Sequence, residues 1–446
     1  MLLTFEIENF LSFKERQAFT FLADYNRANI FNKNTIAKIP KDRDSSKKSH
    51  VLNGSLLYGA NAGGKTNFIS AFHTLRQIVE NEEALQQIHG EPVFKFTDHL
   101  KPSSFKITIL KELNHKPFLL HYELTFSENE ITYEKLSRQA VKHTTLGKEN
   151  IIYERNYQEI KQYNAAIQSL IDEFLPTNFR NNTLLHLFVN KINHSYFKNI
   201  VRSDAFQWMH AIYHFITENI VLKNHDDLSK NDLADRINKD SNLKQAILHA
   251  LDDVDITIDD FEIIDITNAY MHELIHDMRG LSEQTRNSMV HEQIQQKRIY
   301  DIKTIRKTNH NRYALEFMNE SRGTIEFIRD FIQIFDCIQN NKVYIVDEIE
   351  NHYHPMIQRY ILKTFLDADD ENNKSRAQFI FTTHNTDFLE ANLLAKEQIW
   401  FVDKSSQTLA SELYRFSEFQ DISYKNHNWR NLYNEGRFGA FPKVMD

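Results

Sequence analysis

The sequence predicts an α/β fold whose mixed central sheet is assembled from both ends of the chain, around a helical insertion. Three observations support this prediction. An apolar segment, a glycine-rich loop and an amphipathic helix follow one another within residues 54–79. Far along the chain, residues 343–346 and 378–383 are short apolar runs typical of buried strands. Both runs are followed by ionisable side chains, at the strand ends where open α/β sheets bind their ligands.

The glycine-rich loop is the first candidate site. The chain has 10 glycines in 446 residues, and four of them lie within residues 54–64. Gly59, four further residues and then Gly64-Lys65-Thr66 reproduce the spacing of a P-loop. Such a loop turns backbone N–H groups toward phosphate, and the following helix adds the positive end of its dipole. Lys65 would reach the β- and γ-phosphates, and the Thr66 hydroxyl would bind Mg²⁺. The residues expected to bind nucleotide here are Gly59, Asn61, Gly63, Gly64, Lys65, Thr66 and Asn67.

The apolar run 343–346 leads into two carboxylates, Asp347 and Glu348. A buried strand would deliver Asp347 to the Mg²⁺ and its waters, and would place Glu348 to polarise the attacking water as a general base. Taken alone, the segment also fits an edge strand that leads into an acidic turn. Its combination with a P-loop favours the catalytic interpretation.

His384 follows the apolar run 378–383 directly. At the carboxyl end of a strand, its imidazole could donate a hydrogen bond to a γ-phosphate oxygen and so sense the presence of that phosphate. A structural histidine is the alternative, because the chain contains 21 histidines. The position after the strand, rather than the residue type, supports the functional interpretation.

Ser321 and Gly323 open a segment with helical apolar periodicity. A serine at a helix start, with the helix dipole behind it, is a second anion-binding site. One chain needs only one phosphate cradle, so the second cradle suggests a nucleotide bound between two subunits. An ordinary helix cap is the alternative interpretation.

Together these residues resemble the ABC-type ATPase heads of the RecF, SMC and abortive-infection families. The resemblance rests on GANAGGKT (59–66) as Walker A, YIVDEIE (344–350) as Walker B, TTH (382–384) as the switch-histidine motif and ESRGT (320–324) as a shortened signature motif. The last motif, with segments 7–13, 397–401 and 434–442, is similar to the bacterial phage-defence ATPases of the RloA and AbiLi group. Gly63 and Thr66 stand where serine is usual in these families. Gly63 is still a small residue, and Thr66 still supplies a hydroxyl.

This resemblance implies ATP and Mg²⁺ as cofactors, an ATP-sandwich homodimer or higher oligomer, and hydrolysis by Glu348, His384 and Lys65. Ser321 of one subunit would contact the γ-phosphate held by the other. The protein would be the cytoplasmic sensor or regulatory subunit of an abortive-infection system. A separate nuclease of Toprim-like or HNH type would be its effector, and a nucleic acid or phage protein would be its trigger. A DNA-repair ATPase of the RecF or SMC type is the alternative function.

We expect the ABC-type head to be split by its insertion. Residues 1–154 would hold the P-loop and an antiparallel β subdomain, in which segments 104–110 and 119–126 alternate as half-buried strands. Residues 155–308 would form a helical arm or dimerisation platform. Residues 309–446 would complete the sheet with the signature, Walker B and histidine motifs. The polar residues 38–50 are expected to form an exposed loop.

Composition excludes several other classes of protein. One cysteine excludes an internal disulfide framework, and no run approaches the roughly 20 apolar residues of a membrane span, so no membrane partner is expected. The net charge of −8 argues against a broadly basic nucleic-acid-binding surface. The basic residues Lys297, Arg298, Lys303, Arg306 and Lys307 are a local exception. A solvated helix face is the expected explanation, with a nucleic acid or an acidic partner as alternatives.

Two histidine pairs offer rival metal sites. His272-Glu273 and His276 form an H-E-x-x-H pattern, which on a helix would hold Zn²⁺ and a general base. No histidine follows at the metzincin spacing. Glu292 lies at a distance that a third ligand of a gluzincin could have, but nothing else supports it, so a zinc hydrolase is a remote alternative. His352 and His354 follow the Walker B segment, where contact with a second subunit is expected rather than a metal.

Overall fold

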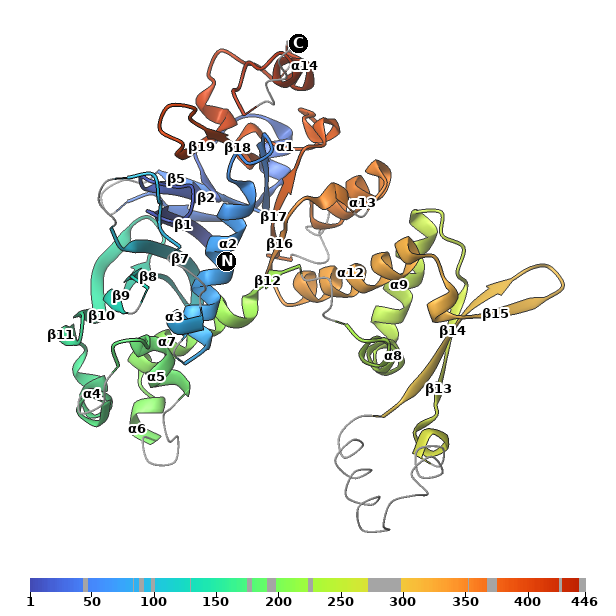
Figure 1. Ribbon diagram of the computed structural model, residues 1–446, viewed down its shortest axis with the longest axis horizontal. Helices are drawn as coiled ribbons and strands as arrows, with labels where there is room; N and C mark the ends of the chain where they lie inside the picture. The colour runs from blue at the N-terminus through green and yellow to red at the C-terminus, as the bar shows by residue number, and fades with distance from the viewer. Residues whose placement is uncertain are drawn as a thin grey trace. The chain divides into compact units, whose positions relative to one another are not determined.

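The computed structural model of the protein describes residues 1–42, 47–82, 84–87, 92–97, 101–128, 130–174, 179–190, 198–223, 228–271, 298–351, 353–366, 375–424 and 427–440 (Figure 1). The chain forms two compact units. The head unit comprises Met1–Lys223, Cys337–Asn351 and Ile361–Asp446, and the insertion unit comprises Asn224–Asp336 and His352–Tyr360.

A six-stranded sheet in the head unit joins both ends of the chain. Its order is β12-β16-β17-β6-β18-β19, parallel throughout except for β19. The strands are β6 (Gly54–Gly59), β12 (Ile220–Leu222), β16 (Val343–Val346), β17 (Gln378–Thr383), β18 (Ile399–Lys404) and β19 (Ser411–Arg415). Central strands β6, β16 and β17 are buried at every residue, as parallel strands covered on both faces are. The strands predicted around the P-loop, before Asp347 and before His384 are therefore confirmed.

The second sheet of the head unit is antiparallel, with seven strands in the order β11-β10-β9-β8-β7-β1-β2. The strands are β1 (Leu2–Glu8), β2 (Gln17–Thr20), β7 (Ser103–Leu113), β8 (Lys116–Phe126), β9 (Ile131–Val141), β10 (Leu146–Asn156) and β11 (Glu159–Tyr163). The pairing of β7 with β8 confirms the two half-buried strands that their alternating residues predict.

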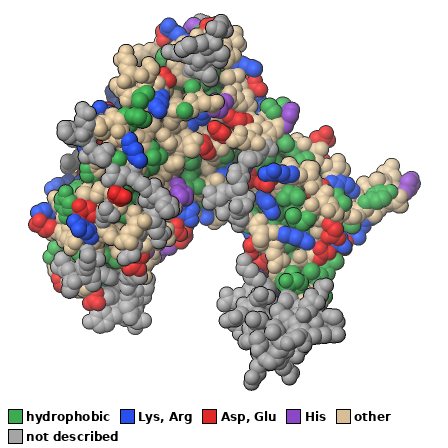
Figure 2. All heavy atoms as spheres, viewed as in Figure 1, with side chains coloured by type: hydrophobic (Ala, Val, Ile, Leu, Met, Phe, Trp, Pro, Cys, Tyr) green, Lys and Arg blue, Asp and Glu red, His purple; other side chains and the backbone are tan. Residues whose placement is uncertain are grey.

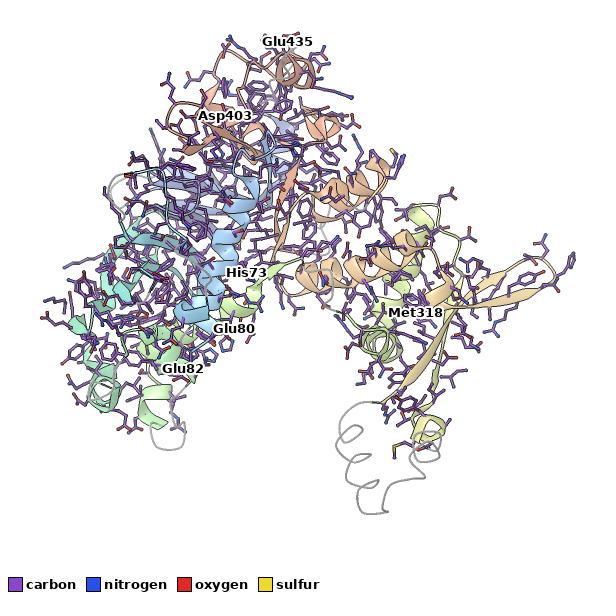
Figure 3. The ribbon with its side chains drawn as sticks, viewed as in Figure 1. His73, Glu80, Glu82, Met318, Asp403 and Glu435 are labelled. Carbon is purple, nitrogen blue, oxygen red and sulfur yellow. The ribbon has the colours of Figure 1, made fainter. Side chains whose placement is uncertain are left out.

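Helix α2 (Lys65–Glu80) packs its apolar face against both sheets. The ring of Phe72 stacks on Phe5 of β1 at a centroid distance of 4.0 Å, and Leu57 of β6 belongs to the same core. His73 and Glu80 lie on the exposed side of the helix (Figure 3). The core holds α2 rigidly, so the P-loop at its N-terminus has a fixed position.

The polar segment 38–50 is not the exposed loop that we expected. It contributes β4 (Thr35–Pro40) and β5 (Lys48–Leu52), which form a three-stranded sheet with β3 (Leu22–Ala23) in the order β3-β5-β4. His50 is buried because its ring packs on Phe31 at a centroid distance of 5.2 Å. Composition alone concealed β4 and β5, because tertiary contacts bury polar residues such as Ser49 and His50. Residues 43–46 lie outside the described residues.

The helices of the head unit are mostly short. They are α1 (Asn29–Lys33), α2, α3 (Ala84–Gln87), α4 (Gln168–Phe174), α5 (Leu184–Asn190), α6 (Lys198–Val201), α7 (Asp204–His214) and α14 (Trp429–Asn434). Its single turns of 3₁₀ or π helix are η1 (Ala165–Ile167), η2 (Phe215–Asn219), η4 (Ile349–Asn351), η5 (Thr386–Phe388), η6 (Lys396–Gln398) and η7 (Phe416–Glu418). A further 3₁₀ turn, η3 (Phe317–Asn319), belongs to the insertion unit. Two longer helices, α12 (Arg322–Gln339) and α13 (Pro355–Leu366), run through the boundary between the units.

The insertion unit is not the helical arm predicted for residues 155–308. The head unit continues to Lys223, because α5 and α7 bury side chains such as Phe188 and Met209 in its core. The insertion unit combines α8 (Lys230–Lys239) and α9 (Ser241–Asp253) with an antiparallel sheet of β13 (Asp260–Asp265), β14 (Tyr300–Lys307) and β15 (Arg312–Glu316). The mixture of charged and apolar residues in β13 and β14 concealed their strand character.

Charged side chains of both signs are interspersed over the visible surface of the protein (Figure 2). An interspersed distribution agrees with the net charge of −8, whereas a broadly basic surface would not. Among the described residues, no helix combines the length and the apolar character that a membrane crossing requires.

A buried charge pair ties α5 to the antiparallel sheet. The Glu134 carboxylate accepts hydrogen bonds from Arg155 Nε (3.0 Å), the Tyr122 and Tyr153 hydroxyls (3.0 and 2.9 Å) and the backbone N–H groups of Leu184 and Leu185 (2.8 and 3.1 Å). The Glu134 and Arg155 side chains are fully buried. The carboxylate therefore neutralises Arg155 and caps the positive end of α5.

Replacing Glu134 with Ala is expected to destabilise the head unit by about 3–5 kcal/mol, because Arg155 would keep a buried charge without its carboxylate. Urea unfolding followed by tryptophan fluorescence measures the change. Glu130→Ala is the matched control: its partner Arg180 is 57% exposed, so the loss should stay within about 1 kcal/mol. Equal losses in the two variants would contradict the role given to the buried pair.

Candidate nucleotide-binding site

The P-loop lies where β6 ends and α2 begins, and its glycines are required by close backbone contacts. Gly64 has a φ of +121°, and a Cβ added to it would meet Ser411 Oγ at 2.6 Å. A Cβ on Gly59 would meet the Val402 carbonyl oxygen at 2.5 Å. Because any side chain at these positions would collide with β18 or β19, the loop backbone packs tightly against the sheet and leaves its other side open.

Two serines that the sequence did not single out support this loop. Ser411 Oγ donates to the Gly63 carbonyl oxygen (2.7 Å) and lies 2.8 Å from Ser12 Oγ. Asn67 Nδ2 donates to the same Ser12 hydroxyl (2.8 Å). Ser12 follows β1 and Ser411 opens β19, so residues from opposite ends of the chain hold the loop. Their roles depend on tertiary contacts, and no local pattern marks them.

Lys65 reaches back across the loop as a phosphate-binding lysine does. Its Nζ donates to the carbonyl oxygens of Gly59 (2.9 Å) and Ala60 (3.4 Å) and lies 2.8 Å from His384 Nε2. Burial lowers the pKa of Lys65, although the neighbouring carboxylates oppose the shift. Burial and the Lys65 charge lower the pKa of His384. A neutral His384 can therefore accept from the lysine through Nε2.

Thr66 and Asp347 converge on one point, as a Mg²⁺ site requires. Thr66 Oγ1 donates to Asp347 Oδ2 (2.8 Å), and Thr382 Oγ1 donates to the other carboxylate oxygen, Asp347 Oδ1 (2.5 Å). Hydroxyl and carboxylate oxygens are the ligands that Mg²⁺ prefers, and the ion usually keeps several waters besides. The residues present therefore fit a Mg²⁺ ion held by Thr66 and Asp347 together with a nucleotide.

Neighbouring residues hold both the backbone and the side chain of Glu348 in place. Its φ of 49° is unusual for a residue with a Cβ, and its N–H donates to Thr382 Oγ1 (2.7 Å). Its carboxylate accepts from Asn351 Nδ2 (2.7 Å). Strained backbone of this kind concentrates at functional sites. The turn directs the Glu348 carboxylate into the cavity beside the P-loop.

Glu350 is a further site residue that sequence reasoning missed. Its carboxylate accepts from the Thr383 hydroxyl (2.8 Å) and from the His384 backbone N–H (2.5 Å). It therefore links the Walker B turn to the end of β17 and sets the position of His384. The acidic run around Asp347 could have suggested such a role, but not which atoms it bonds.

These groups surround one cavity of about 670 Å³. Its lining includes most of the residues predicted for the site and adds Glu350, Asn351 and Lys404. The full lining is Ala60, Asn61, Ala62, Gly64, Lys65, Thr66, Asn67, Glu348, Glu350, Asn351, His384 and Lys404. Gly59, Gly63 and Asp347 do not line the cavity, but each is hydrogen-bonded to a residue that does: Gly59 to Lys65, Gly63 to Ala60 and Asp347 to Thr66. Four segments far apart in the sequence thus meet at one polar cavity.

The predicted signature residues lie in the insertion unit, at the start of α12. Ser321 Oγ accepts from the Thr324 backbone N–H (3.1 Å), so it caps the helix. Ser321 and Gly323 are both exposed. The cap interpretation and the anion-site interpretation are compatible, because the exposed first turn still presents N–H groups and the positive end of the helix dipole.

The basic stretch near residue 300 is a strand, not the solvated helix face that we expected. Lys303 pairs with Glu316 (3.0 Å) and Arg298 with Asp265 (3.7 Å). Arg306 pairs with Glu320 through two bonds (2.7 and 2.9 Å). Acidic partners in the same unit compensate these cations, so the stretch does not form an open basic patch. Lys307 lies at the exposed end of β14, and Lys297 lies outside the described residues.

The rival metal sites remain predictions. His272, Glu273 and His276 lie outside the described residues, as does His352. His354 accepts from the Met356 backbone N–H through Nδ1 (3.3 Å) at the start of α13. Within the described ranges, no group of three or more His, Cys, Asp or Glu side chains could hold a metal ion.

A comparison with protein families found a match over most of the chain. A protein-family model described as "AAA domain, putative AbiEii toxin, Type IV TA system" matches residues 55–390. No curated protein matches the chain. Among solved structures, the SMC head domain from Thermotoga maritima is similar with a TM-score of 0.38 and 12% identity, over 93% of this chain and 98% of that one.

Proposed function

Because the chain belongs to the AAA domain family of the AbiEii toxin type, we propose that it binds and hydrolyses ATP as the regulatory subunit of an anti-phage system. One observation carries the ATPase part. Lys65, Thr66, Asp347, Glu348 and His384 come from three distant segments and meet around one cavity. Such convergence of a phosphate cradle, a metal site and a general base serves nucleotide hydrolysis.

The chain's own residues divide the work of hydrolysis. The P-loop backbone and Lys65 bind the phosphates. Thr66 and Asp347 would hold Mg²⁺, which when bound would supply positive charge to the phosphate oxygens. Glu348 accepts a proton from the attacking water, and Asn351 keeps its carboxylate in place. His384, positioned by Glu350, leaves Lys65 for the γ-phosphate and so reports that ATP is bound.

The exposed signature turn supports an ATP-sandwich homodimer. Ser321 and Gly323 offer a second anion-binding helix start within the insertion unit. In the proposed dimer this turn contacts the γ-phosphate bound by the P-loop of a second copy. ATP would then hold two subunits together, and hydrolysis would release them.

The proposed role in defence rests on the family description and on the signature and closing segments. A type IV toxin–antitoxin system is named in that description. The narrower likeness to the RloA and AbiLi group stays a prediction, as does a cytoplasmic location. In this proposal a separate Toprim-like or HNH nuclease is the effector, and a phage protein or a nucleic acid triggers its release.

The proposal is tested by isolating the tagged protein from its native host before and during phage infection. A nuclease that co-purifies, and that phage infection or ATP hydrolysis activates, is the expected result. Phage plating on cells with wild-type protein or the Glu348→Gln variant measures the biological effect. ATP turnover stimulated by DNA without any partner, and no change in plating, would instead favour a RecF- or SMC-type repair ATPase.

Arg306 is the residue that anchors the signature turn. Its guanidinium forms the bidentate pair with Glu320, the residue directly before Ser321, and Thr304 donates to the same carboxylate. Only 5% of the Glu320 side chain is exposed. Burial raises the pKa of Glu320, but the hydrogen bonds and charge of its partners outweigh this and hold the pKa below its usual value. The carboxylate is therefore ionised and fixed at neutral pH.

Replacing Arg306 with Ala is expected to reduce ATP turnover about ten- to hundredfold, because small displacements of catalytic groups are costly. ATP binding to the P-loop should not change, since the head unit keeps all its contacts. Steady-state turnover and binding of a fluorescent ATP analogue separate the two effects. Amide exchange at Thr324 and Ile325 should accelerate. Lys303→Ala is the control on the same strand, and a comparable loss there would argue against a specific anchor.

A further inference from the structure

The outer edge of β15 is open. In the order β13-β14-β15, the described residues provide no strand beyond β15. Arg312, Tyr313, Ala314 and Leu315 are all exposed, Tyr313 at 55% and Leu315 at 37%. Figure 2 shows hydrophobic side chains on the projecting β14–β15 hairpin, and Met318, 55% exposed, lies just past the end of β15 (Figure 3). Proteins usually protect such an edge with proline, a bulge or inward charges, and β15 has no proline or bulge.

The ladder between β14 and β15 determines which backbone groups face this edge. The Thr308 N–H donates to the Asn311 carbonyl oxygen (2.8 Å), and hydrogen-bonded pairs alternate along an antiparallel ladder. Arg306 lies opposite Tyr313, and Thr304 lies opposite Leu315. Tyr313 and Leu315 therefore turn their backbone groups toward β14. Arg312, Ala314 and Glu316 therefore turn their N–H and C=O groups toward the free edge.

The sequence of this edge is complementary to itself. An antiparallel copy centred on Ala314 places Arg312 opposite Glu316, so opposite charges meet at both ends. The same register places Tyr313 opposite Leu315 twice, which would bring the large apolar side chains of the two strands into contact in two cross-strand pairs. It also brings the free backbone groups of Arg312, Ala314 and Glu316 into hydrogen-bonded positions, on the order of six bonds.

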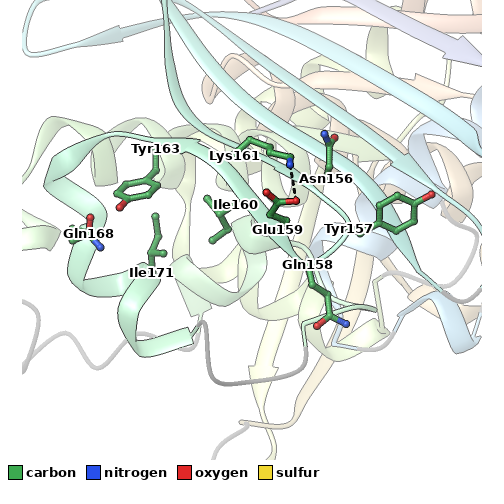
Figure 4. Close-up of a pocket in the computed structure, with 9 residues that line it drawn as sticks. All are labelled: Asn156, Tyr157, Gln158, Glu159, Ile160, Lys161, Tyr163, Gln168 and Ile171. Atoms are coloured by element: carbon green, nitrogen blue, oxygen red, sulfur yellow. Dashed lines mark ion pairs between the residues drawn. The ribbon is translucent and has the colours of Figure 1, made fainter.

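Two other edge strands of the described sheets, β11 and β13, lack this property. In β11, an antiparallel copy centred on Lys161 would place two lysines opposite each other, and Glu159 already pairs with Lys161 (2.5 Å) within one chain (Figure 4). In β13, a copy centred between Glu262 and Ile263 would oppose Asp260 to Asp265. Like charges at these positions disfavour self-pairing. Self-complementarity is thus a feature of β15 rather than of every exposed strand.

We propose that β15 is a self-association surface, on which two copies of the chain pair antiparallel about a two-fold axis at Ala314. The contact requires no nucleotide and goes beyond the proposed ATP clamp. A five-residue strand buries less than the roughly 1,200 Å² of a stable interface, so the pairing is weak and reversible by itself.

The experiment measures self-association without nucleotide, in the Lys65→Ala background, where the proposed ATP clamp cannot form. Sedimentation velocity at protein concentrations up to about 200 µM should show a reversible dimer. Arg312→Glu and Glu316→Arg should each weaken it about thirtyfold, because each puts like charges opposite one another at both ends. Lys161→Glu on β11 is the control and should change nothing.

Mixing the two single variants provides the decisive result. The Arg312→Glu chain carries two acids on its edge and the Glu316→Arg chain carries two bases, so the mixed pair is complementary and should recover dimerisation. Within one chain these substitutions disturb the Arg312–Glu262 and Lys303–Glu316 pairs, which mixing cannot repair. Recovery therefore identifies contact between copies. The proposal would be overturned if the protein with the wild-type β15 stayed monomeric, or if the mixture dimerised no better than either variant alone.

The same background also permits a geometric test. Ala314→Cys should form a covalent dimer rapidly with a short bis-maleimide, because the two-fold axis passes beside this residue. The native Cys337 is buried, so the unmodified background should not react. Lys161→Cys, on the β11 edge, should cross-link much more slowly. Equal rates at both edges would indicate random collision and contradict the proposed pairing. ATP-dependent dimerisation of the chain with Lys65 intact reports separately on the proposed function.

Discussion

Replacing Glu348 with Gln is expected to lower ATP turnover by about two to four orders of magnitude, the usual contribution of a general base. The amide keeps the shape of the side chain and can still contact Asn351, but it cannot accept a proton from water. ATP binding should persist, because Lys65, Thr66 and Asp347 are unchanged. The variant should therefore accumulate the ATP-bound dimer, which in the proposed cycle is released only after hydrolysis.

Phosphate release measures the turnover of this variant, and light scattering with ATP and Mg²⁺ measures its dimerisation. Glu412→Gln, on the exposed face of β19, is the matched control and should behave like the wild type. Glu350→Gln should have an intermediate effect, since Glu350 acts only through Thr383 and His384. Wild-type turnover in Glu348→Gln would remove this residue from the mechanism.

Replacing Lys65 with Ala is expected to weaken ATP binding by about a hundredfold or more. The ammonium makes charge-assisted hydrogen bonds to phosphate oxygens, each worth about 1.5–3 kcal/mol, and no other cation reaches into the loop from α2. The substitution also removes the hydrogen bonds that the Lys65 amine donates to the Gly59 and Ala60 carbonyl oxygens of the loop. Both turnover and ATP-dependent dimerisation should then disappear.

Equilibrium binding of a fluorescent ATP analogue measures this loss, and ADP binding tests the β-phosphate contact by itself. Lys404→Ala removes a second cation from the lining of the same cavity, and it should weaken binding less than tenfold because Lys404 lies outside the P-loop. Circular dichroism checks that both variants keep their fold. A Lys65→Ala variant that binds ATP normally would contradict the phosphate cradle.

The parts of the site that could be predicted are those in which chemistry is encoded over a few adjacent residues. A P-loop needs glycines, a lysine and a hydroxyl at fixed spacing, because its backbone wraps one phosphate. A Walker B segment needs a buried strand that ends in carboxylates. Both kinds of segment are local, and β6, β16, β17 and α2 form where these patterns predicted them.

Residues that act through distant partners could not be predicted. Ser12 and Ser411 are separated by almost the whole chain, yet together they hold the P-loop. Glu350 resembles any acidic turn residue until β17 brings His384 beside it. The basic residues of this stretch looked like a solvated face because acidic partners such as Asp265, Glu316 and Glu320 lie on other segments of the chain.

The sequence by itself determined the nucleotide-binding elements and the resemblance that names their family, because phosphate and Mg²⁺ impose short, strict patterns. Only the tertiary structure decided where the head unit ends, which carboxylates hold the signature turn and the switch histidine, and which strand edge stays open. These features depend on which surfaces pack together and which charges find partners. Packing and pairing are properties of residues distant in sequence, and so no local pattern encodes them.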